Sequence, residues 1–405
     1  MKTIEAVCPG CGNHGMQQFY AVDNIPVNSC LVVDSAAAGR DFPRGNLRVA
    51  VCESCGFITN TAFDLRRLTY DATYEETQIF SPTFTRFQDR LIQRLLDEHD
   101  LYGKTVVEIG CGKGDFLARM AELGDVHGIG IDPTSIQGRL QGKAAENVRF
   151  INEFYGPQHA SIPADLVACR HALEHIPDVD DLLRTVRDSV GDRPIPIFFE
   201  LPETMRVLRE GAYWDIYFEH CNYFTPGSLA RAFESRGFGV TGVWLGYDEQ
   251  YLMLQATSRP RNGSRRTAPY AAKLDQPADV VQACAAFEAS IGEKLNGWRH
   301  YFSEAAERGK KVAIWGSGSK CVAFLSTIGV DEEIAFVTDV NPHRHGKYLV
   351  GTGKAIVPPS VLAEHPPDEV VVMNPIYRDE VAAMLGEMGV NCRVITAETP
   401  LEAVA

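Results

Sequence analysis

The 405-residue sequence lacks any apolar run long enough to cross a bilayer, and its first residues, 1–7, contain no apolar signal core. It also lacks an excess of basic side chains, since 39 lysines and arginines stand against 53 aspartates and glutamates, a net charge of −14. This balance argues against general binding to nucleic acid or to an anionic membrane. We therefore expect a cytoplasmic protein of two or three domains whose partners include neither nucleic acid nor membrane.

Eleven cysteines in such a chain are expected to be thiols or metal ligands rather than disulfides. Four of them form two Cys-x-x-Cys pairs, Cys8 with Cys11 and Cys52 with Cys55, and a glycine follows each pair. Two residues between cysteines allow both thiolates to point at one ion, and two such pairs complete a tetrahedral zinc site. A redox-active pair is the alternative. Because four thiolates leave no open position, the sequence predicts a structural zinc.

Residues 106–116 read Val-Val-Glu-Ile-Gly-Cys-Gly-Lys-Gly-Asp-Phe, which predicts a strand, a glycine-spaced turn and the start of a helix. Glycines allow a sharp turn and a close approach of a ligand to free backbone N–H groups. An ordinary tight turn would look the same, but a second apolar stretch ends in Asp132 about 20 residues further on. An acid at that place in a strand–helix–strand unit suits a ribose diol.

Further strands are predicted at 148–151, 164–169 and 195–202, alternating with helical segments. This alternation indicates an open, mostly parallel sheet, and such sheets bind ligands at the carboxyl ends of their strands. Polar residues follow several of these ends, and one pocket is expected to collect them: Glu108, Asp132, Glu153, His171 and His175.

The order Glu-x-Gly-x-Gly-x-Gly, Gly-Ile-Asp and Leu-Glu-His-Ile-Pro-Asp resembles the class I methyltransferases that use S-adenosylmethionine (SAM). The resemblance implies that Gly110, Gly112 and Gly114 pass the methionine part of SAM and that Asp132 holds its ribose. We include Glu108, Glu153 and His171 among the expected SAM-binding residues. An NAD-binding domain is the alternative for the same loop, but Leu-Glu-His-Ile-Pro-Asp has no counterpart in dehydrogenase patterns.

Residues 213–226 are dense in aromatic and titratable side chains and precede a predicted helix at 227–236. Within them lies the tetrapeptide Tyr217-Phe218-Glu219-His220, which has the pattern Tyr-x-Glu-His. A histidine titrates near neutrality and can serve as a general base, and an adjacent carboxylate could orient it. The alternative, a structural histidine, is disfavoured by the density of functional groups around it.

This segment resembles the C-methyltransferases of nucleotide-linked deoxysugars, which share the order of a four-cysteine unit, a SAM domain and a second α/β domain. The resemblance implies that His220 removes the proton next to a sugar ketone, with Tyr217, Glu219 and His175 beside it. It also implies a small nucleotide-sugar substrate, a role in deoxysugar biosynthesis, and a monomer or homodimer. An O-methyltransferase on a related sugar and a non-catalytic SAM- or sugar-nucleotide-binding protein remain the alternatives.

A polar linker at 258–268 and a long helix at about 279–309 are predicted to lead into a second strand–glycine loop–helix unit at 311–320. Gly316-x-Gly318 lacks a third glycine, which argues against a dinucleotide there. The family resemblance extends over this domain and implies that its loops help to hold the nucleotide-sugar. The expected substrate-binding residues are Tyr74, Tyr223, Lys320, Asp339, His343 and Arg344, and Lys347 is a further local cation.

Taken together, these patterns predict an α/β protein with a zinc-binding unit at 1–65, a Rossmann-like SAM domain at 66–258 and a Rossmann-like C-terminal domain at 259–405. Residues 66–104 form a connector that ends in an amphipathic helix at 85–99. The aromatic part of this connector, 70–82, is either a packed linker or a lid over the ligand.

Overall fold

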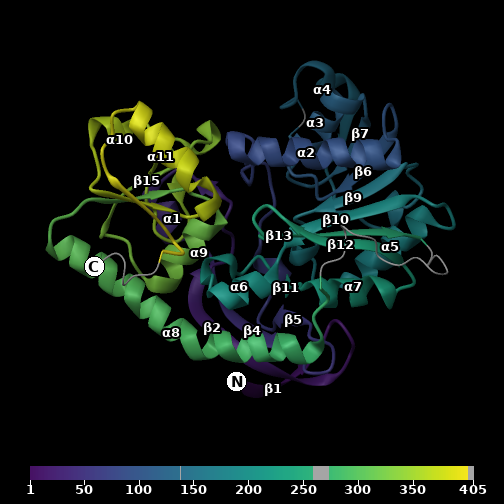
Figure 1. Cartoon of the computed structure of the whole chain (residues 1–405), viewed down its shortest axis with the longest axis horizontal. Coiled ribbons are helices and arrows are strands. Elements are labelled where there is room, and N and C mark those ends of the chain that lie inside the picture. Colours follow the sequence, from purple (N-terminus) through teal and green to yellow (C-terminus); the bar gives the residue numbers. More distant parts are fainter. Residues whose placement is uncertain (137, 259–272, 400–405) are drawn as a thin grey trace.

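The computed structural model describes residues 1–136, 138–258 and 273–399, whose strands form three larger sheets and one two-stranded ribbon (Figure 1). The N-terminal sheet is antiparallel, in the order β1-β2-β4-β5-β11. Its strands are β1 (Lys2–Val7), β2 (His14–Pro26), β4 (Arg44–Val51), β5 (Ile58–Asn60) and β11 (Asn222–Tyr223). The last strand directly follows Cys221, so the segment that carries His220 is tied into the N-terminal sheet.

The central sheet has the order β12-β13-β10-β9-β6-β7-β8. The five strands from β6 to β10 are parallel, and β13 runs antiparallel to both β10 and β12. The strands are β6 (Thr105–Ile109), β7 (His127–Ile131), β8 (Val148–Ile151), β9 (Leu166–Arg170), β10 (Pro196–Pro202), β12 (Gly239–Gly246) and β13 (Tyr251–Thr257). The strands predicted near 106, 128, 148, 164 and 195 are confirmed, with ends displaced by at most two residues.

Helices cover both faces of this sheet because neighbouring strand residues point to opposite sides. Val106 packs in a cluster with α2 (Pro82–His99) and α3 (Asp115–Gly124), whereas Val107 packs with α5 (Val179–Val190) and α7 (Pro226–Glu234). Shorter helical turns connect the strands: α4 (Gly142–Asn147), η2 (Pro157–His159), η3 (Leu173–His175), α6 (Thr204–Glu210) and η4 (Tyr213–Asp215).

The helix predicted at 85–99 begins three residues earlier than expected. Ser81 caps it by accepting a hydrogen bond from the backbone N–H of Phe84, and Pro82 occupies the first turn, where a missing N–H costs nothing. The long helix predicted at about 279–309 is α8 (Pro277–Glu307). It runs from the N-terminal sheet to the C-terminal domain and contacts β2, α6 and α9 on its way (Figure 1).

The C-terminal sheet is parallel, in the order β17-β15-β14-β18-β19. Its strands are β14 (Val312–Trp315), β15 (Ile334–Thr338), β17 (Ile356–Val357), β18 (Glu369–Val372) and β19 (Arg393–Thr396). Its helices are α9 (Ser319–Ile328), η5 (Pro342–Arg344), α10 (Val361–Glu364), η6 (Pro375–Tyr377) and α11 (Arg378–Glu387). Almost all of the predicted linker at 258–268 lies outside the described residues.

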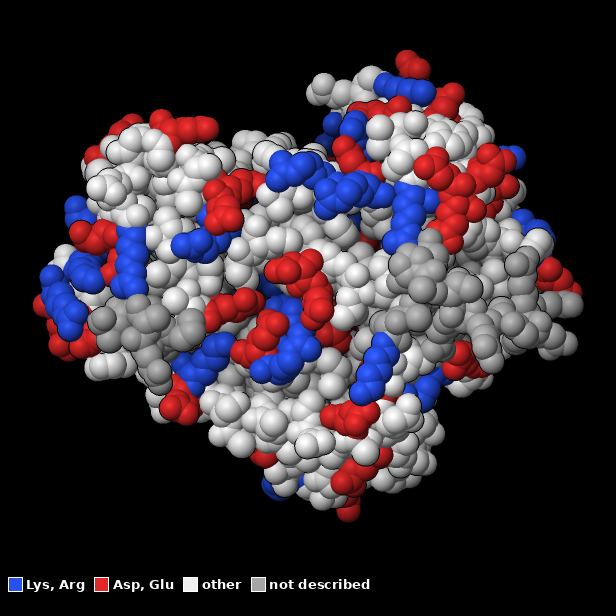
Figure 2. All heavy atoms as spheres, viewed as in Figure 1, with Lys and Arg blue, Asp and Glu red and all other residues white. Residues whose placement is uncertain are grey.

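The N-terminal unit and the C-terminal domain also touch each other. β3 (Val32–Val33) pairs with β16 (Tyr348–Leu349) as a short antiparallel ribbon, and α1 (Ala36–Arg40) and η1 (Leu65–Arg67) complete the N-terminal unit. Acidic and basic side chains are interspersed over the face seen in Figure 2. Among the described helices, none is both long enough and apolar enough to span a bilayer.

Candidate active site

A cavity of about 420 Å³ opens at the carboxyl ends of β6, β7 and β9. The loop between β6 and α3 forms one wall. Gly110 and Gly112 there adopt φ values of 66° and 52°, and a Cβ on Gly112 would come within 2.0 Å of the Glu76 carboxylate. Glycine is therefore required both for the backbone conformation and for the close approach of the connector. Gly114, the third glycine of the motif, has φ 82° and begins α3.

Asp132 follows β7 and also lines this cavity. Its carboxylate accepts hydrogen bonds from the backbone N–H of Gly112, at 2.9 Å, and from the backbone N–H and hydroxyl of Thr134, both at 2.7 Å. The acid predicted to face a ribose thus also fixes the glycine loop, which gives the cavity wall one defined shape.

Two further carboxylates in the cavity wall each have an oxygen atom that is buried and has no hydrogen-bond partner among the described residues: Oε2 of Glu76 and Oε2 of Glu108. Burial raises the pKa of Glu76 to about 7 and that of Glu108 to about 8, against the weaker opposing effects of Lys113 and Arg170. Unpaired buried carboxylates favour a bound cation. The cavity therefore suits a ligand that carries an ammonium group and ribose hydroxyls.

A second cavity, of about 290 Å³, lies between the central sheet and the C-terminal domain. It shares Tyr74, Glu76, His171 and His175 with the first, so ligands in the two cavities would meet at these side chains. The connector reaches this junction because Leu31 bridges to Tyr74 and the N–H of Glu75 donates to Cys30 O at 3.1 Å. Residues 70–82 are thus a packed linker that also lines both cavities.

His220 lies in the wall of the second cavity and is 3% exposed. Its ring packs edge-on against His175, with centroids 4.8 Å apart, and lies 4.0 Å from the ring of Tyr217. Burial, followed by the positive charges at His175, His171 and Lys320, lowers the pKa of His220 well below its usual value. The imidazole is therefore neutral at pH 7 and able to accept a proton.

His175 lines both cavities at the place where they meet. Its Nδ1 lies 3.1 Å from the Tyr70 hydroxyl, which fixes the ring orientation. Tyr217 is half-buried, and its removal from water raises the pKa of its hydroxyl well above the usual value, so that this hydroxyl stays protonated. Both side chains lie beside His220, and their catalytic roles stay predictions.

Glu219 does not face His220. Its carboxylate accepts hydrogen bonds from Asn28 Nδ2 and from the backbone N–H of Ser29, both at 2.8 Å, and from the Ser29 hydroxyl. These bonds attach the His220 segment to the N-terminal unit. The geometry thus gives Glu219 a structural role and does not support the catalytic role predicted for it.

His171 bridges two carboxylates beside the junction. Its Nε2 lies 3.0 Å from Glu200 Oε1 and its Nδ1 3.6 Å from Glu174 Oε1. Burial would lower the pKa of His171, but Glu174 and Glu200 outweigh it and raise the pKa to about 9. The residue adopts φ 49°, a left-handed conformation that is uncommon outside glycine and holds the ring in this position.

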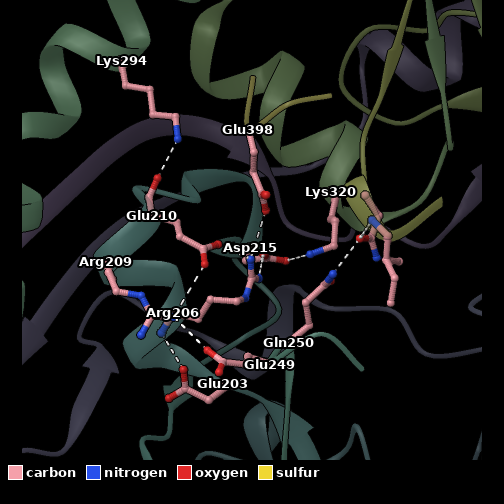
Figure 3. Close-up of polar contacts among 12 residues, drawn as sticks. Glu203, Arg206, Arg209, Glu210, Asp215, Glu249, Gln250, Lys294, Lys320 and Glu398 are labelled. Carbon is pink, nitrogen blue, oxygen red and sulfur yellow. Dashed lines mark hydrogen bonds and ion pairs between the residues drawn. The ribbon is translucent and has the colours of Figure 1, made fainter. Parts of the chain in front are cut away.

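Ion pairs between the central and the C-terminal domain form part of the wall of the second cavity (Figure 3). Asp215 pairs with Lys320 and, at 2.8 Å, with Arg206, whose guanidinium also contacts Glu210 and Glu398. Although burial opposes it, these two cations keep the pKa of Asp215 below its usual value. Nearby, Gln250 donates a hydrogen bond of 2.9 Å to Asn374, joining the central sheet to the C-terminal domain.

Several side chains predicted to bind a ligand line neither cavity and contact other protein groups instead. Glu153 is exposed, lines neither cavity and lies 3.4 Å from His159, so the geometry does not support its predicted role in SAM binding. Tyr223 lies behind the wall, where its hydroxyl donates to Tyr217 O, and His343 packs against Phe80.

Asp339 and Arg344 line the second cavity but are engaged with the protein itself. Asp339 accepts from the backbone N–H and hydroxyl of Ser317, both at 2.7 Å. The buried guanidinium of Arg344 donates to the backbone carbonyls of Ser317 and Glu75. Arg344 therefore connects the C-terminal glycine loop to the connector. Lys320 also lines the second cavity, and its ammonium group pairs with the Asp215 carboxylate.

The four cysteines of the N-terminal unit come together in space, with all four sulfur atoms within 4.8 Å of one another. The Cys8–Cys55 and Cys11–Cys52 sulfur distances are 3.6 and 3.7 Å, and the N–H of Gly10 points at the Cys8 sulfur from 3.3 Å. Sulfurs at about 2.3 Å from a tetrahedral ion are separated by about 3.8 Å. The donor set and its spacing are therefore compatible with zinc.

The comparisons with known proteins follow the same division of the chain. Residues 80–243 match the methyltransferase domain family, and residues 257–395 match the C-methyltransferase C-terminal domain family. The chain is a SAM-dependent methyltransferase with a C-methyltransferase C-terminal domain. The predicted fold class, a Rossmann-like class I methyltransferase domain with a second Rossmann-like domain after it, is confirmed.

The methyltransferase is 26% identical over 393 residues to C-methyltransferase NovU of Streptomyces niveus, which covers 92% of this chain and 90% of the relative. It is 31% identical over 173 residues to a ubiquinone biosynthesis O-methyltransferase of Methylobacterium sp., over 36% of this chain and 66% of that relative. Among solved structures, magnesium protoporphyrin IX methyltransferase from Synechocystis with bound SAH aligns with 17% identity and a TM-score of 0.34, over 43% of this chain and 83% of the other.

The sequence interpretation assigned no role to three residues at the site: Glu76, Glu174 and Arg206. Glu174 stands inside the Leu-Glu-His motif, so its position was visible, but the sequence did not indicate that its side chain points into the second cavity. Glu76 and Arg206 belong to no motif, and their roles depend on contacts with distant parts of the chain.

Proposed function

We propose that the methyltransferase transfers the methyl group of SAM to the carbon next to the ketone of a nucleotide-linked 4-keto sugar, with His220 as general base. The observation that carries this proposal is the buried, neutral His220 in the wall of the second cavity, with its ring packed against His175 at the junction of the two cavities. A ketone acidifies its neighbouring C–H group, and a neutral imidazole beside it can take that proton. SAM supplies an electrophilic methyl group to the resulting enolate carbon.

The chain's own residues provide the remaining functions. The glycine loop, Asp132, Glu76 and Glu108 would hold SAM, while Tyr74, His171 and His175 would surround the place where the two ligands meet and exclude water. The protonated hydroxyl of Tyr217 is a candidate donor to the enolate oxygen, since such donors act where charge develops. Cys8, Cys11, Cys52 and Cys55 would hold a structural zinc.

Deuterium exchange tests this proposal. A nucleoside-diphosphate 4-keto-6-deoxyhexose incubated with the enzyme in D₂O without SAM should gain one deuterium next to the ketone, because His220 returns a solvent deuteron to the enolate. A variant with His220 replaced by asparagine should not catalyse this exchange. If the enzyme catalyses no exchange with any keto sugar but methylates a hydroxyl group, the proposal is wrong.

SAM affinity should depend on pH. Without ligand, the pKa values of Glu76 and Glu108 are raised to about 7 and about 8, and a bound ammonium group would lower both. Binding then releases protons, so affinity should rise from about pH 6 to about pH 8, and it weakens by up to about tenfold per group for each unit below that group's pKa. Calorimetric Kd values between about pH 6 and pH 9 measure this, and Glu76→Gln should flatten the curve. A Kd that does not vary over this range would contradict it.

Lys320 should contribute to binding of the substrate diphosphate. Replacing it by methionine removes the cation from the cavity wall but keeps the aliphatic volume, so KM for the sugar nucleotide should rise roughly tenfold with a smaller change in kcat. Lys347→Met is the matched control, because Lys347 pairs with Asp34 on the surface. Equal effects of the two substitutions on KM would refute the assignment.

A further inference from the structure

Glu174 is a buried carboxylate, without a hydrogen bond to the described part of the chain, in the wall of the second cavity. Its side chain is 2% exposed, yet neither carboxylate oxygen has a hydrogen-bond partner among the described residues. The nearest charged contact is His171 Nδ1, at 3.6 Å from Glu174 Oε1. The shorter contact of His171, at 3.0 Å, joins its Nε2 to Glu200 Oε1. A buried carboxylate without hydrogen bonds is costly, and the ion pair of Glu174 with His171 is longer than a hydrogen bond, so Glu174 can still accept a further cationic partner.

The free partner in this region is His220. One carboxylate oxygen of Glu174 and one ring nitrogen each of His175 and His220 all lie within 4.8 Å of one another. No hydrogen bond to a ring nitrogen of His220 is present among the described residues. His175 is already engaged, since its Nδ1 contacts the Tyr70 hydroxyl.

The two backbones are also fixed relative to each other. Glu174 belongs to η3, and its backbone carbonyl accepts a hydrogen bond of 3.3 Å from the thiol of Cys221. Cys221 directly follows His220 in the chain. Asn222 Nδ2 donates to Ile176 O at 2.8 Å, which adds a second connection between the same two segments. The carboxylate and the imidazole are therefore held facing the same space.

The remaining groups around His220 either destabilise a positive charge on its ring or carry no charge that would stabilise it. His175, His171 and Lys320 each disfavour the imidazolium electrostatically. Tyr217 and Tyr223 present their rings, at 4.0 and 6.1 Å between centroids. The neighbouring carboxylate, Glu219, is turned toward Asn28 and Ser29.

We propose that Glu174 is the positioning residue for the general base, holding the His220 ring and stabilising the imidazolium that forms when it takes the substrate proton. This inference rests on the proposed function. In the step, the C–H bond next to the ketone breaks, its electron pair forms the enolate, and the proton moves to a ring nitrogen of His220. The Glu174 carboxylate gains a cationic partner in the same step, which lowers the energy of the charged state.

The test compares Glu174→Gln with Glu219→Gln in the deuterium-exchange assay. Glu174→Gln should slow exchange roughly 10- to 100-fold. It should also move the acidic limb of the pH profile to lower pH, because the imidazolium loses its negative neighbour and the pKa of His220 falls further. SAM affinity should not change, since Glu174 does not line the first cavity. Glu219→Gln should leave the position of the acidic limb unchanged.

Unchanged exchange and an unchanged pH profile in Glu174→Gln, together with lost exchange in His220→Asn, would refute this inference and leave the proposed function intact. Exchange that persists in His220→Asn would instead refute the proposed function. Two histidines and a glutamate can also bind a divalent cation. If a chelator abolished exchange while the zinc content stayed at that of the four-cysteine site, and added Zn²⁺ restored it, Glu174 would be a metal ligand and the inference would be wrong.

Discussion

Replacing His220 by asparagine is expected to lower the rate of methyl transfer at least about 100-fold, the usual contribution of a positioned general base. Asparagine keeps a polar group of similar reach but cannot accept the substrate proton. Because His220 lines the second cavity and not the first, Kd for SAM should remain that of the wild-type enzyme. Steady-state kinetics and calorimetry measure the two quantities.

His365→Asn provides a control, since His365 stacks on Phe336 in the C-terminal domain, away from both cavities. It should retain wild-type rates. If His220→Asn also retained a rate within a few-fold of wild type, another group would have to remove the proton. If it lost SAM binding as well, the two cavities would be coupled more tightly than their separate linings indicate.

Loss of the four-cysteine site should be the most damaging change to stability. Cys8 and Cys52 are each 1% exposed and pack in one cluster with Phe57, Phe224 and residues of α7. Replacing both by serine should release the zinc and lower the free energy of unfolding by on the order of 5 kcal/mol, because a structural metal contributes directly to folding. Elemental analysis and denaturant unfolding measure the two effects.

Cys392→Ser is the matched control, because Cys392 is half-buried in the C-terminal domain and outside the cluster. It should keep one zinc per chain and near wild-type stability. Carefully purified wild-type protein with almost no metal would defeat the zinc assignment, and so would a Cys8→Ser, Cys52→Ser protein of unchanged stability.

The sequence was informative wherever function depends on local chain geometry. The glycine loop requires glycines because Gly110, Gly112 and Gly114 have positive φ values, and that requirement is written in the sequence. The carboxyl-end rule for parallel sheets then brought Asp132, His171 and His175 to one cavity without knowledge of any contact. Two Cys-x-x-Cys pairs likewise specified their cluster despite the distance between them in the chain.

The sequence was least informative about the direction of buried charged side chains. Glu219 adjoins His220 in the chain, but its carboxylate accepts hydrogen bonds from Asn28 and Ser29 of the N-terminal unit. The Glu174 carboxylate, by contrast, lies within 4.8 Å of a ring nitrogen of His220. Arg344 was predicted to bind the substrate, yet its guanidinium donates to backbone carbonyls of two other segments. Such pairings depend on tertiary contacts, which neither periodicity nor motif spacing encodes.

The position of the transferred methyl group tests the central claim most directly. The enzyme would be incubated with methyl-labelled SAM and a nucleoside-diphosphate 4-keto-6-deoxyhexose, and the product examined by NMR. We expect a labelled methyl group bonded to the ring carbon next to the ketone, with the hydrogen of that carbon lost. A labelled methyl group bonded to a sugar oxygen would contradict it.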